Sequence, residues 1–176
     1  DALELDPEAA TIIVSMSECY WKLGKAKKSE ELLFNALNLD PNDYEAREML
    51  ANQYIFQNKH DKAIEQYRVL AENSVEGDPK YLIALAKLVL SQNNINESIS
   101  LFIKAFEKDK SRIDILEEAA NLSLRSRELD KARDLYKKLI DIDKNNSYYL
   151  STYIDLIVMS GDYENGINAL ESLILI

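Results

Sequence analysis

The stretch Ala36-Leu37-Asn38-Leu39-Asp40-Pro41 decides the fold, because nearly the same residues, Ala2-Leu3-Glu4-Leu5-Asp6-Pro7, open the chain. The two prolines, Pro7 and Pro41, are 34 residues apart. Self-similarity at a fixed period of this length is typical of chains built from helical units that stack on their neighbours. The sequence therefore predicts an array of repeats, and the period can be tested along the rest of the chain.

The test places both prolines at position 32 of a repeating unit. The units are then 10–43, 44–77, 79–112, 113–146 and a shortened 147–176, with 1–9 as the tail of a preceding unit and Asp78 inserted after the second. Position 8 is small in four of the five units: Ser17, Ala51, Ala86, Ala120 and Ile154. Position 20 is small throughout: Ser29, Ala63, Ser98, Ala132 and Gly166. Position 24 is bulky: Leu33, Tyr67, Phe102, Tyr136 and Leu170.

These columns predict two helices per unit that approach closely at positions 8 and 20, with the large residue at position 24 filling the space beside them. The fifth unit departs from the pattern because Ile154 is bulky. We expect the missing side chain of Gly166 to make room for Ile154.

The small pairs resemble the tetratricopeptide repeat (TPR) family over nearly the whole chain. Further support comes from Tyr20 and Tyr54 at position 11, Gly24 and Gly161 at position 15, and the Leu-Asp-Pro-Asn run that ends at Asn42. The family's tryptophan at position 4 is absent. The resemblance implies an all-α fold, a right-handed α-α superhelical solenoid of stacked antiparallel helix pairs. We expect one array over 1–176, cut from a longer one.

Apolar spacing and capping residues place the helices of the first three units at about 7–23, 27–39, 43–57, 61–73, 80–91 and 96–108. Turns are expected at Arg127 and Gly161 in the later units. The segment 74–79 is the most loop-like in the chain and contains the extra residue. We expect a locally altered stacking angle there, without a domain boundary.

Composition excludes several function classes. The net charge of −10 disfavours nucleic acid, whose phosphates need Lys and Arg, and also anionic membrane surfaces. No apolar run is long enough for a transmembrane helix. The single cysteine, Cys19, excludes an internal disulfide and fits a reducing compartment, so we expect a cytoplasmic protein.

Candidate catalytic and metal-binding residues lack partners in the sequence. His60 lies in a predicted turn without a second His or paired Cys, and we interpret it as an exposed turn residue. Cys19 occupies a small-residue column and is expected to be buried packing. The run at 141–145 resembles the start of a calcium loop, but the required Gly is Asn146 and the closing Glu is Thr152. We therefore expect no catalytic site, no metal and no cofactor.

The candidate binding surface follows from the resemblance, which implies that positions 2, 5, 9, 12 and 13 of each first helix line a concave groove. The partner-binding residues expected there are Glu18, Trp21, Lys22, Glu48, Asn52, Ile55, Phe56, Lys87, Asn121 and Arg125. Trp21 and Phe56 are candidate anchors. For Ile55, packing against a neighbouring helix is the alternative. Asn52 and Asn121 are expected to hydrogen-bond the backbone of a bound peptide with both ends of their amides.

These residues predict a non-catalytic scaffold whose groove binds a peptide or helix of a partner protein. Two alternatives stay open. The chain could be the substrate-recognition arm of a larger enzyme, such as a protein glycosyltransferase. It could also self-assemble into a homo-oligomer through its apolar C-terminal edge, Leu173-Ile174-Leu175-Ile176.

One negative prediction is specific. TPR proteins that hold the acidic C-terminal tails of chaperones use Lys at position 5 and Asn at position 9 of one unit, followed by further Asn, Lys and Arg in the next two. In units two to four the first two places are Glu48 and Asn52, and no triplet of units has the basic set. Calorimetry should therefore detect no binding of an acidic chaperone-tail peptide, and a micromolar complex would contradict this.

Overall fold

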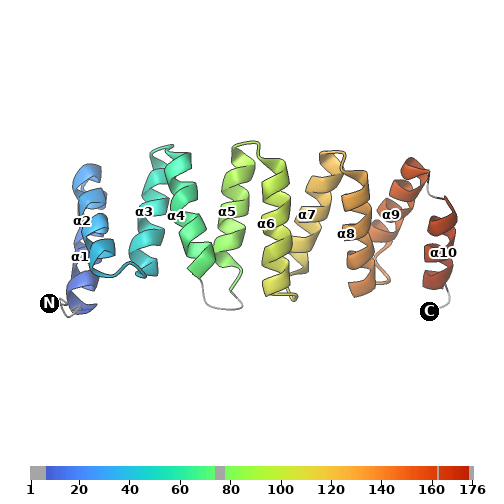
Figure 1. Ribbon diagram of the computed structural model, residues 1–176, viewed down its shortest axis with the longest axis horizontal. Helices are drawn as coiled ribbons and strands as arrows, with labels where there is room; N and C mark the ends of the chain where they lie inside the picture. The colour runs from blue at the N-terminus through green and yellow to red at the C-terminus, as the bar shows by residue number, and fades with distance from the viewer. Residues whose placement is uncertain (1–6, 74–77, 162, 175–176) are drawn as a thin grey trace. The chain divides into compact units, whose positions relative to one another are not determined.

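The computed structural model describes residues 7–73, 78–161 and 163–174. Over these residues the chain is helical and contains no strand (Figure 1). The helices are α1 (Pro7–Lys22), α2 (Ala26–Leu39), α3 (Tyr44–Phe56), α4 (His60–Asn73), α5 (Lys80–Ser91), α6 (Ile95–Lys108), α7 (Ile113–Arg125), α8 (Leu129–Ile142), α9 (Ser147–Ser160) and α10 (Tyr163–Ile174). The helices expected in the first three units are all present, with ends that differ by at most one residue.

The turn inside each repeat has one backbone geometry. Position 15 of every unit lies in the left-handed region, at Gly24, Asn58, Asn93, Arg127 and Gly161, with φ between 57° and 73°. Glycine and, less readily, asparagine adopt this conformation, whereas it is uncommon for arginine. The periodicity thus fixes where the chain reverses, even in the units that lack the glycine.

Two helix starts have a side-chain cap. The Asp43 carboxylate accepts a hydrogen bond from the N–H of Ala46 at the start of α3. The side-chain amide oxygen of Asn146 accepts hydrogen bonds from the N–H groups of Tyr148 and Tyr149 at the start of α9. Both use the preferred N-cap residue types.

Within the first, second and fourth repeats, the two helices meet at the small residues of positions 8 and 20. Ala51 and Ala63 are fully buried, as are Ala120 and Ala132. In the first unit the same place holds two serines, and their hydroxyl oxygens lie 2.8 Å apart between Ser17 and Ser29. The close approach predicted from these columns is confirmed.

The last repeat achieves this approach in a different way from the one expected. A Cβ added to Gly166 would lie 2.2 Å from Cγ2 of Ile157, and the three nearest atoms all belong to Ile157. Ile154 is instead 38% exposed. Ile157 lies one helical turn further along α9, so it is this side chain that occupies the space the glycine leaves.

Two other expectations are wrong. Cys19 is exposed, because no described helix precedes α1 to cover this position. The equivalent residue of the next repeat, Gln53, is buried. His60 does not lie in a turn: it is the first residue of α4 and is half-buried.

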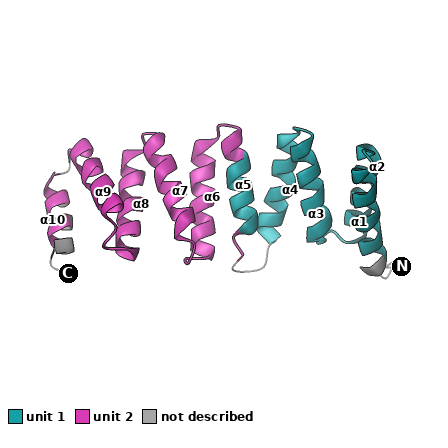
Figure 2. Cartoon of the chain, turned by 180° about the vertical axis from the view of Figure 1, so that it is seen from behind, with its two compact units in different colours: residues 1–76, 80–88 teal, residues 77–79, 89–176 magenta. Residues whose placement is uncertain are grey.

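The chain divides into two compact units, coloured separately in Figure 2. Unit 1 comprises residues 1–76 and 80–88, which include α1 to α4 and α5 as far as Leu88. Unit 2 comprises residues 77–79 and 89–176, which include α6 to α10. The expected change of stacking angle falls largely on residues 74–77, which lie outside the described part, as does much of the apolar C-terminal edge. The single array over 1–176 stays a prediction.

The packing at Gly166 generates a stability prediction. Replacing glycine with alanine inside a helix normally stabilises it by about 1 kcal/mol. Here Gly166→Ala should instead destabilise by about 1–3 kcal/mol, because the new methyl group overlaps Ile157. Urea unfolding followed by circular dichroism measures the change.

The matched control is the double variant Gly166→Ala with Ile157→Ala. Removing Cγ2 of Ile157, the atom that the new methyl group would overlap, should recover part of the loss, so that the two changes are not additive. Strictly additive effects would contradict the assigned contact.

Candidate functional site

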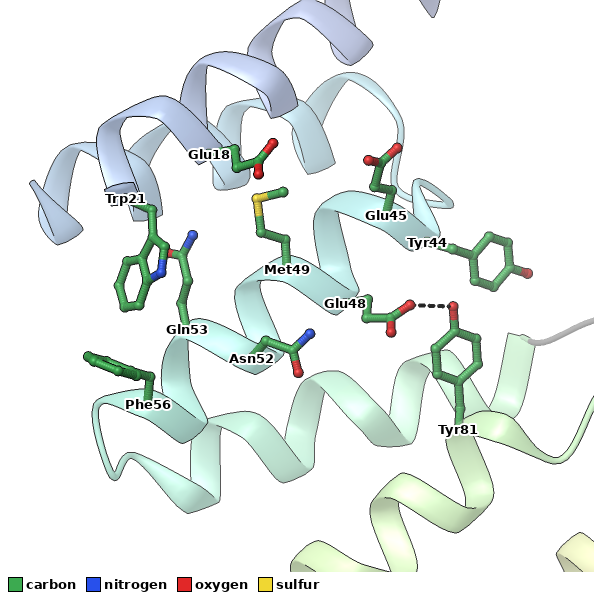
Figure 3. A pocket seen from close by; sticks show the side chains of 10 residues that line it. All are labelled: Glu18, Trp21, Tyr44, Glu45, Glu48, Met49, Asn52, Gln53, Phe56 and Tyr81. Atoms are coloured by element: carbon green, nitrogen blue, oxygen red, sulfur yellow. Dashed lines mark hydrogen bonds between the residues drawn. The ribbon is translucent and has the colours of Figure 1, made fainter. Parts of the chain in front are cut away.

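A pocket of about 580 Å³ opens in unit 1 between α1, α3 and the first turn of α5 (Figure 3). Its walls combine aromatic, acidic and amide side chains. The lining residues are Glu18, Trp21, Tyr44, Glu45, Glu48, Met49, Asn52, Gln53, Phe56 and Tyr81. All of them belong to unit 1.

Two aromatic rings form one end of the pocket. Trp21 and Phe56 meet edge to face, with ring centroids 5.4 Å apart and ring planes at 83°. Phe56 is nevertheless 78% exposed. An exposed phenylalanine next to a tryptophan is an apolar surface suited to contact with another molecule.

The other end of the pocket is acidic. Glu48 accepts hydrogen bonds from the Lys80 ammonium group at 2.7 Å and from the Tyr81 hydroxyl at 3.1 Å. Glu18, on the opposite wall, pairs with Lys22 at 2.7 Å, and this hydrogen bond raises the pKa of the lysine. Exposed pairs of this kind contribute little free energy and can exchange partners.

Two stacked tyrosines support the acidic end. The rings of Tyr44 and Tyr81 lie 6.4 Å apart and nearly parallel, at 11°. The Tyr44 hydroxyl donates a hydrogen bond to the backbone carbonyl of Asn73, at the end of α4. These contacts tie α3, α4 and α5 together and hold the wall that carries Glu48.

The amide of Asn52 has only one end left for a ligand. Its carbonyl oxygen accepts a 2.8 Å hydrogen bond from the hydroxyl of Tyr67, which is buried. Asn121 in unit 2 makes the same bond with Tyr136, at 2.6 Å. We expected both ends of the amide at position 9 to bind a peptide. Because the oxygen is used by a tyrosine, only the NH₂ group is left to donate a hydrogen bond to a ligand.

Both of these tyrosine hydroxyls are buried, which affects their ionisation. Burial is the main cause that raises the pKa of Tyr67 and of Tyr136 above the ordinary value for tyrosine. A buried hydroxyl needs a hydrogen-bond partner. Asparagine occurs at position 9 only in the two units with tyrosine at position 24. This pairing of asparagine with tyrosine is visible in the sequence and could have predicted the hydrogen bond between positions 9 and 24.

Gln53 forms a buried part of the pocket wall and is 3% exposed. Its NH₂ group donates to the Ser29 hydroxyl at 2.8 Å, while its carbonyl oxygen has no hydrogen-bond partner within the described part of the chain. Gln53, Met49, Tyr44 and Tyr81 occupy positions 10, 6, 1 and 3 of their units. Sequence reasoning did not select them as site residues because it took only the face shared by positions 2, 5, 9, 12 and 13.

Of the residues expected to bind a partner, five line one pocket: Glu18, Trp21, Glu48, Asn52 and Phe56. Lys22 lies next to it through its pair with Glu18. Ile55 is half-buried and does not line the pocket, while Lys87 is exposed on α5. Asn121 and Arg125 belong to α7 in unit 2.

The described residues contain neither a metal-binding cluster nor a membrane-spanning helix. No group of three or more His, Cys, Asp or Glu side chains is arranged to hold a metal ion there. Across the same residues, no helix has the length and apolar character needed to cross a membrane.

The bond between Asn52 and Tyr67 can be tested by a double-mutant cycle. Asn52→Ala should cost about 1 kcal/mol of unfolding free energy, because the buried hydroxyl loses its acceptor. The same change in the Tyr67→Phe background should cost clearly less, with a coupling energy of about 0.5–1.5 kcal/mol by urea unfolding. Lys87→Ala is the matched control. Lys87 occupies position 9 of the third repeat, where position 24 is Phe102, a residue without a hydroxyl. Equal costs in both backgrounds would contradict the bond.

Sequence comparison connects these helix pairs to a known family. Profiles described as tetratricopeptide repeat match residues 32–65 and 83–147, together more than half of the chain. The TPR repeat-containing protein YpiA of Bacillus subtilis (strain 168) is 30% identical over 125 residues, or 71% of this chain. The aligned region is 29% of the length of YpiA, so the chain spans less than a third of that relative.

Solved structures agree on the fold. The crystal structure of MamA superposes with a TM-score of 0.61 at 16% identity, over 95% of this chain and 91% of that one. YrrB, a TPR protein with an unusual peptide-binding site, gives 0.60 at 13% identity, over 98% and 89%. A tetratricopeptide repeat protein from Parabacteroides merdae ATCC 43184 gives 0.58 at 18%, over 97% and 66%. The expected all-α solenoid class is confirmed, and the chain belongs to the tetratricopeptide repeat family.

Proposed function

We propose that the chain is a non-catalytic interaction scaffold, and that the unit 1 pocket binds a segment of a partner protein with an apolar anchor next to a basic residue. The observation that carries the proposal is the composition of that one pocket. Aromatic rings lie at one end of it and carboxylates at the other (Figure 3).

The aromatic end suits the anchor. Phe56 is exposed and Trp21 half-buried, so an apolar side chain placed against them removes further apolar surface from water. Such burial contributes about 25 cal/mol per Å². The residues that dominate the binding energy of protein interfaces are often tryptophans and other aromatic residues that lie in pockets.

The acidic end sets the charge of the partner. Glu18, Glu45 and Glu48 surround this end, and the chain as a whole carries a net charge of −10. A lysine or arginine of the partner gains electrostatic energy here, while an acidic segment is repelled. Complementary charge also raises the association rate at low salt.

The amide of Asn52 suits a peptide backbone. Because Tyr67 uses its oxygen, the free NH₂ group can donate to one carbonyl of an extended segment lying between the two ends. YrrB, which has the same fold at 13% identity, is a TPR protein with a peptide-binding site. A peptide ligand is therefore in keeping with the use of this fold.

The experiment selects ligands by affinity alone, so the natural partner need not be identified first. A random peptide library is panned against the whole chain, and selected peptides are titrated while the fluorescence of Trp21, the only tryptophan, is followed. We expect sequences with an aromatic or aliphatic residue near Lys or Arg. The Trp21→Ala/Phe56→Ala double variant should bind them at least about tenfold more weakly, the equivalent of 1.4 kcal/mol, as measured by calorimetry.

Phe34→Ala is the matched control. Phe34 is an exposed phenylalanine of α2 that does not line the pocket. Its replacement should leave affinity unchanged. Peptides that bind the double variant as tightly as the original chain would overturn the pocket assignment, provided that circular dichroism shows unchanged helicity.

A further inference from the structure

The polar cluster at the acidic end of the pocket has a second copy in unit 2. In the first copy, Glu48 lies one helical turn before Asn52, whose oxygen accepts from Tyr67. In the second copy, Glu117 lies one turn before Asn121, whose oxygen accepts from Tyr136. The repeat frame places these residues at positions 5, 9 and 24 in both cases.

The first helix of the next repeat, α5 or α9, completes each copy with a buried tyrosine at position 3. In unit 1 this residue is Tyr81, and in unit 2 it is Tyr149. Burial is the main cause that raises the pKa of Tyr149, and the negative charge of Glu117 adds to it. In the first copy the carboxylate of Glu48 accepts a hydrogen bond from Tyr81. The repeat frame gives Glu117 and Tyr149 the same two positions in the second copy.

The two copies differ at position 2 of the next repeat. In the first copy this residue is Lys80, whose ammonium nitrogen lies 2.7 Å from Glu48 and 5.0 Å from the centre of the Tyr81 ring. In the second copy it is Tyr148. The sequence of α9 contains no Lys or Arg, and no cation within the described part of the chain forms an ion pair with Glu117.

Tyr148 adds an accessible aromatic surface to the second copy. Its hydroxyl is held by Asn121 and by Tyr136, each at 3.2 Å, and its side chain is 50% exposed. A tyrosine ring whose hydroxyl is held by Asn121, one helical turn after Glu117, is an arrangement that attracts cations, by charge and by the ring face.

We propose that Glu117, Tyr148 and Tyr149 form a second binding site, in unit 2, for a lysine or arginine side chain of a partner protein. Lys80 shows, in the first copy, how such a cation sits between the carboxylate and the ring. The second copy has a carboxylate and a tyrosine ring at the same positions, Glu117 and Tyr149, but Tyr148 stands in place of the lysine. The site is separate from the unit 1 pocket, so it stands whether or not that pocket binds a peptide.

The test uses the whole chain and small probes of defined charge. N-acetyl-arginine amide and N-acetyl-lysine amide are titrated into ¹⁵N-labelled protein, with N-acetyl-citrulline amide as the neutral analogue of arginine. We expect saturating shifts at the amides around Glu117, Asn121 and Tyr148 with one or both cations, and none with citrulline. Comparing the two cations shows which side chain the site prefers.

Variants separate the site from general attraction to an acidic protein. Glu117→Gln should weaken binding at these amides by about fivefold, the equivalent of about 1 kcal/mol. Glu118→Gln removes the same charge from an adjacent exposed residue on another helix face and should have little effect. Tyr148→Lys should place a lysine of the chain itself against Glu117, as Lys80 does against Glu48, and abolish binding.

The proposal fails if Glu117→Gln and Glu118→Gln weaken binding equally, since the probes would then report only net charge. It also fails if citrulline produces the same shifts as arginine. Circular dichroism and the dispersion of the amide spectrum establish that each variant is folded before its affinity is interpreted.

Discussion

The close approach of two helices at a pair of small side chains is the contact on which the rest of the structure depends. At Ala51 and Ala63, and again at Ala120 and Ala132, no side-chain atom beyond Cβ separates the two helix surfaces. A helix pair that approaches this closely leaves room for the large residue at position 24 only at one place. Tyr67 and Tyr136 occupy that place, and from there their hydroxyls reach the first helix of the same repeat.

Most of the fold could be predicted from the sequence because it depends on periodic properties. The repeat of 34 residues locates the helices, and the turn at position 15 follows from the period even where the residue is Arg127. What the period could not supply is the identity of each contact. Ile154 and Ile157 are both bulky residues of α9, and only the three-dimensional arrangement distinguishes the one that lies against Gly166.

The candidate site was predictable to the extent that it follows helix geometry. Five residues at positions that the family resemblance assigns to the groove line one pocket: Glu18, Trp21, Glu48, Asn52 and Phe56. Tyr44 and Tyr81 were missed because their contribution depends on stacking between two different repeats. The exposure of Cys19 was missed because burial of a column in an array depends on which helix lies next to it.

The bond between the groove-facing asparagine and the buried tyrosine has a consequence for how this protein can evolve. A change at position 9 that alters ligand preference also removes the acceptor of a core hydroxyl, so it carries a stability cost unless position 24 loses its hydroxyl as well. Repeats with leucine or phenylalanine at position 24, such as those of Leu33 and Phe102, are free of this epistasis and hold Glu18 and Lys87 at position 9. New specificities should therefore arise first in those repeats, while the repeats of Asn52 and Asn121 drift more slowly.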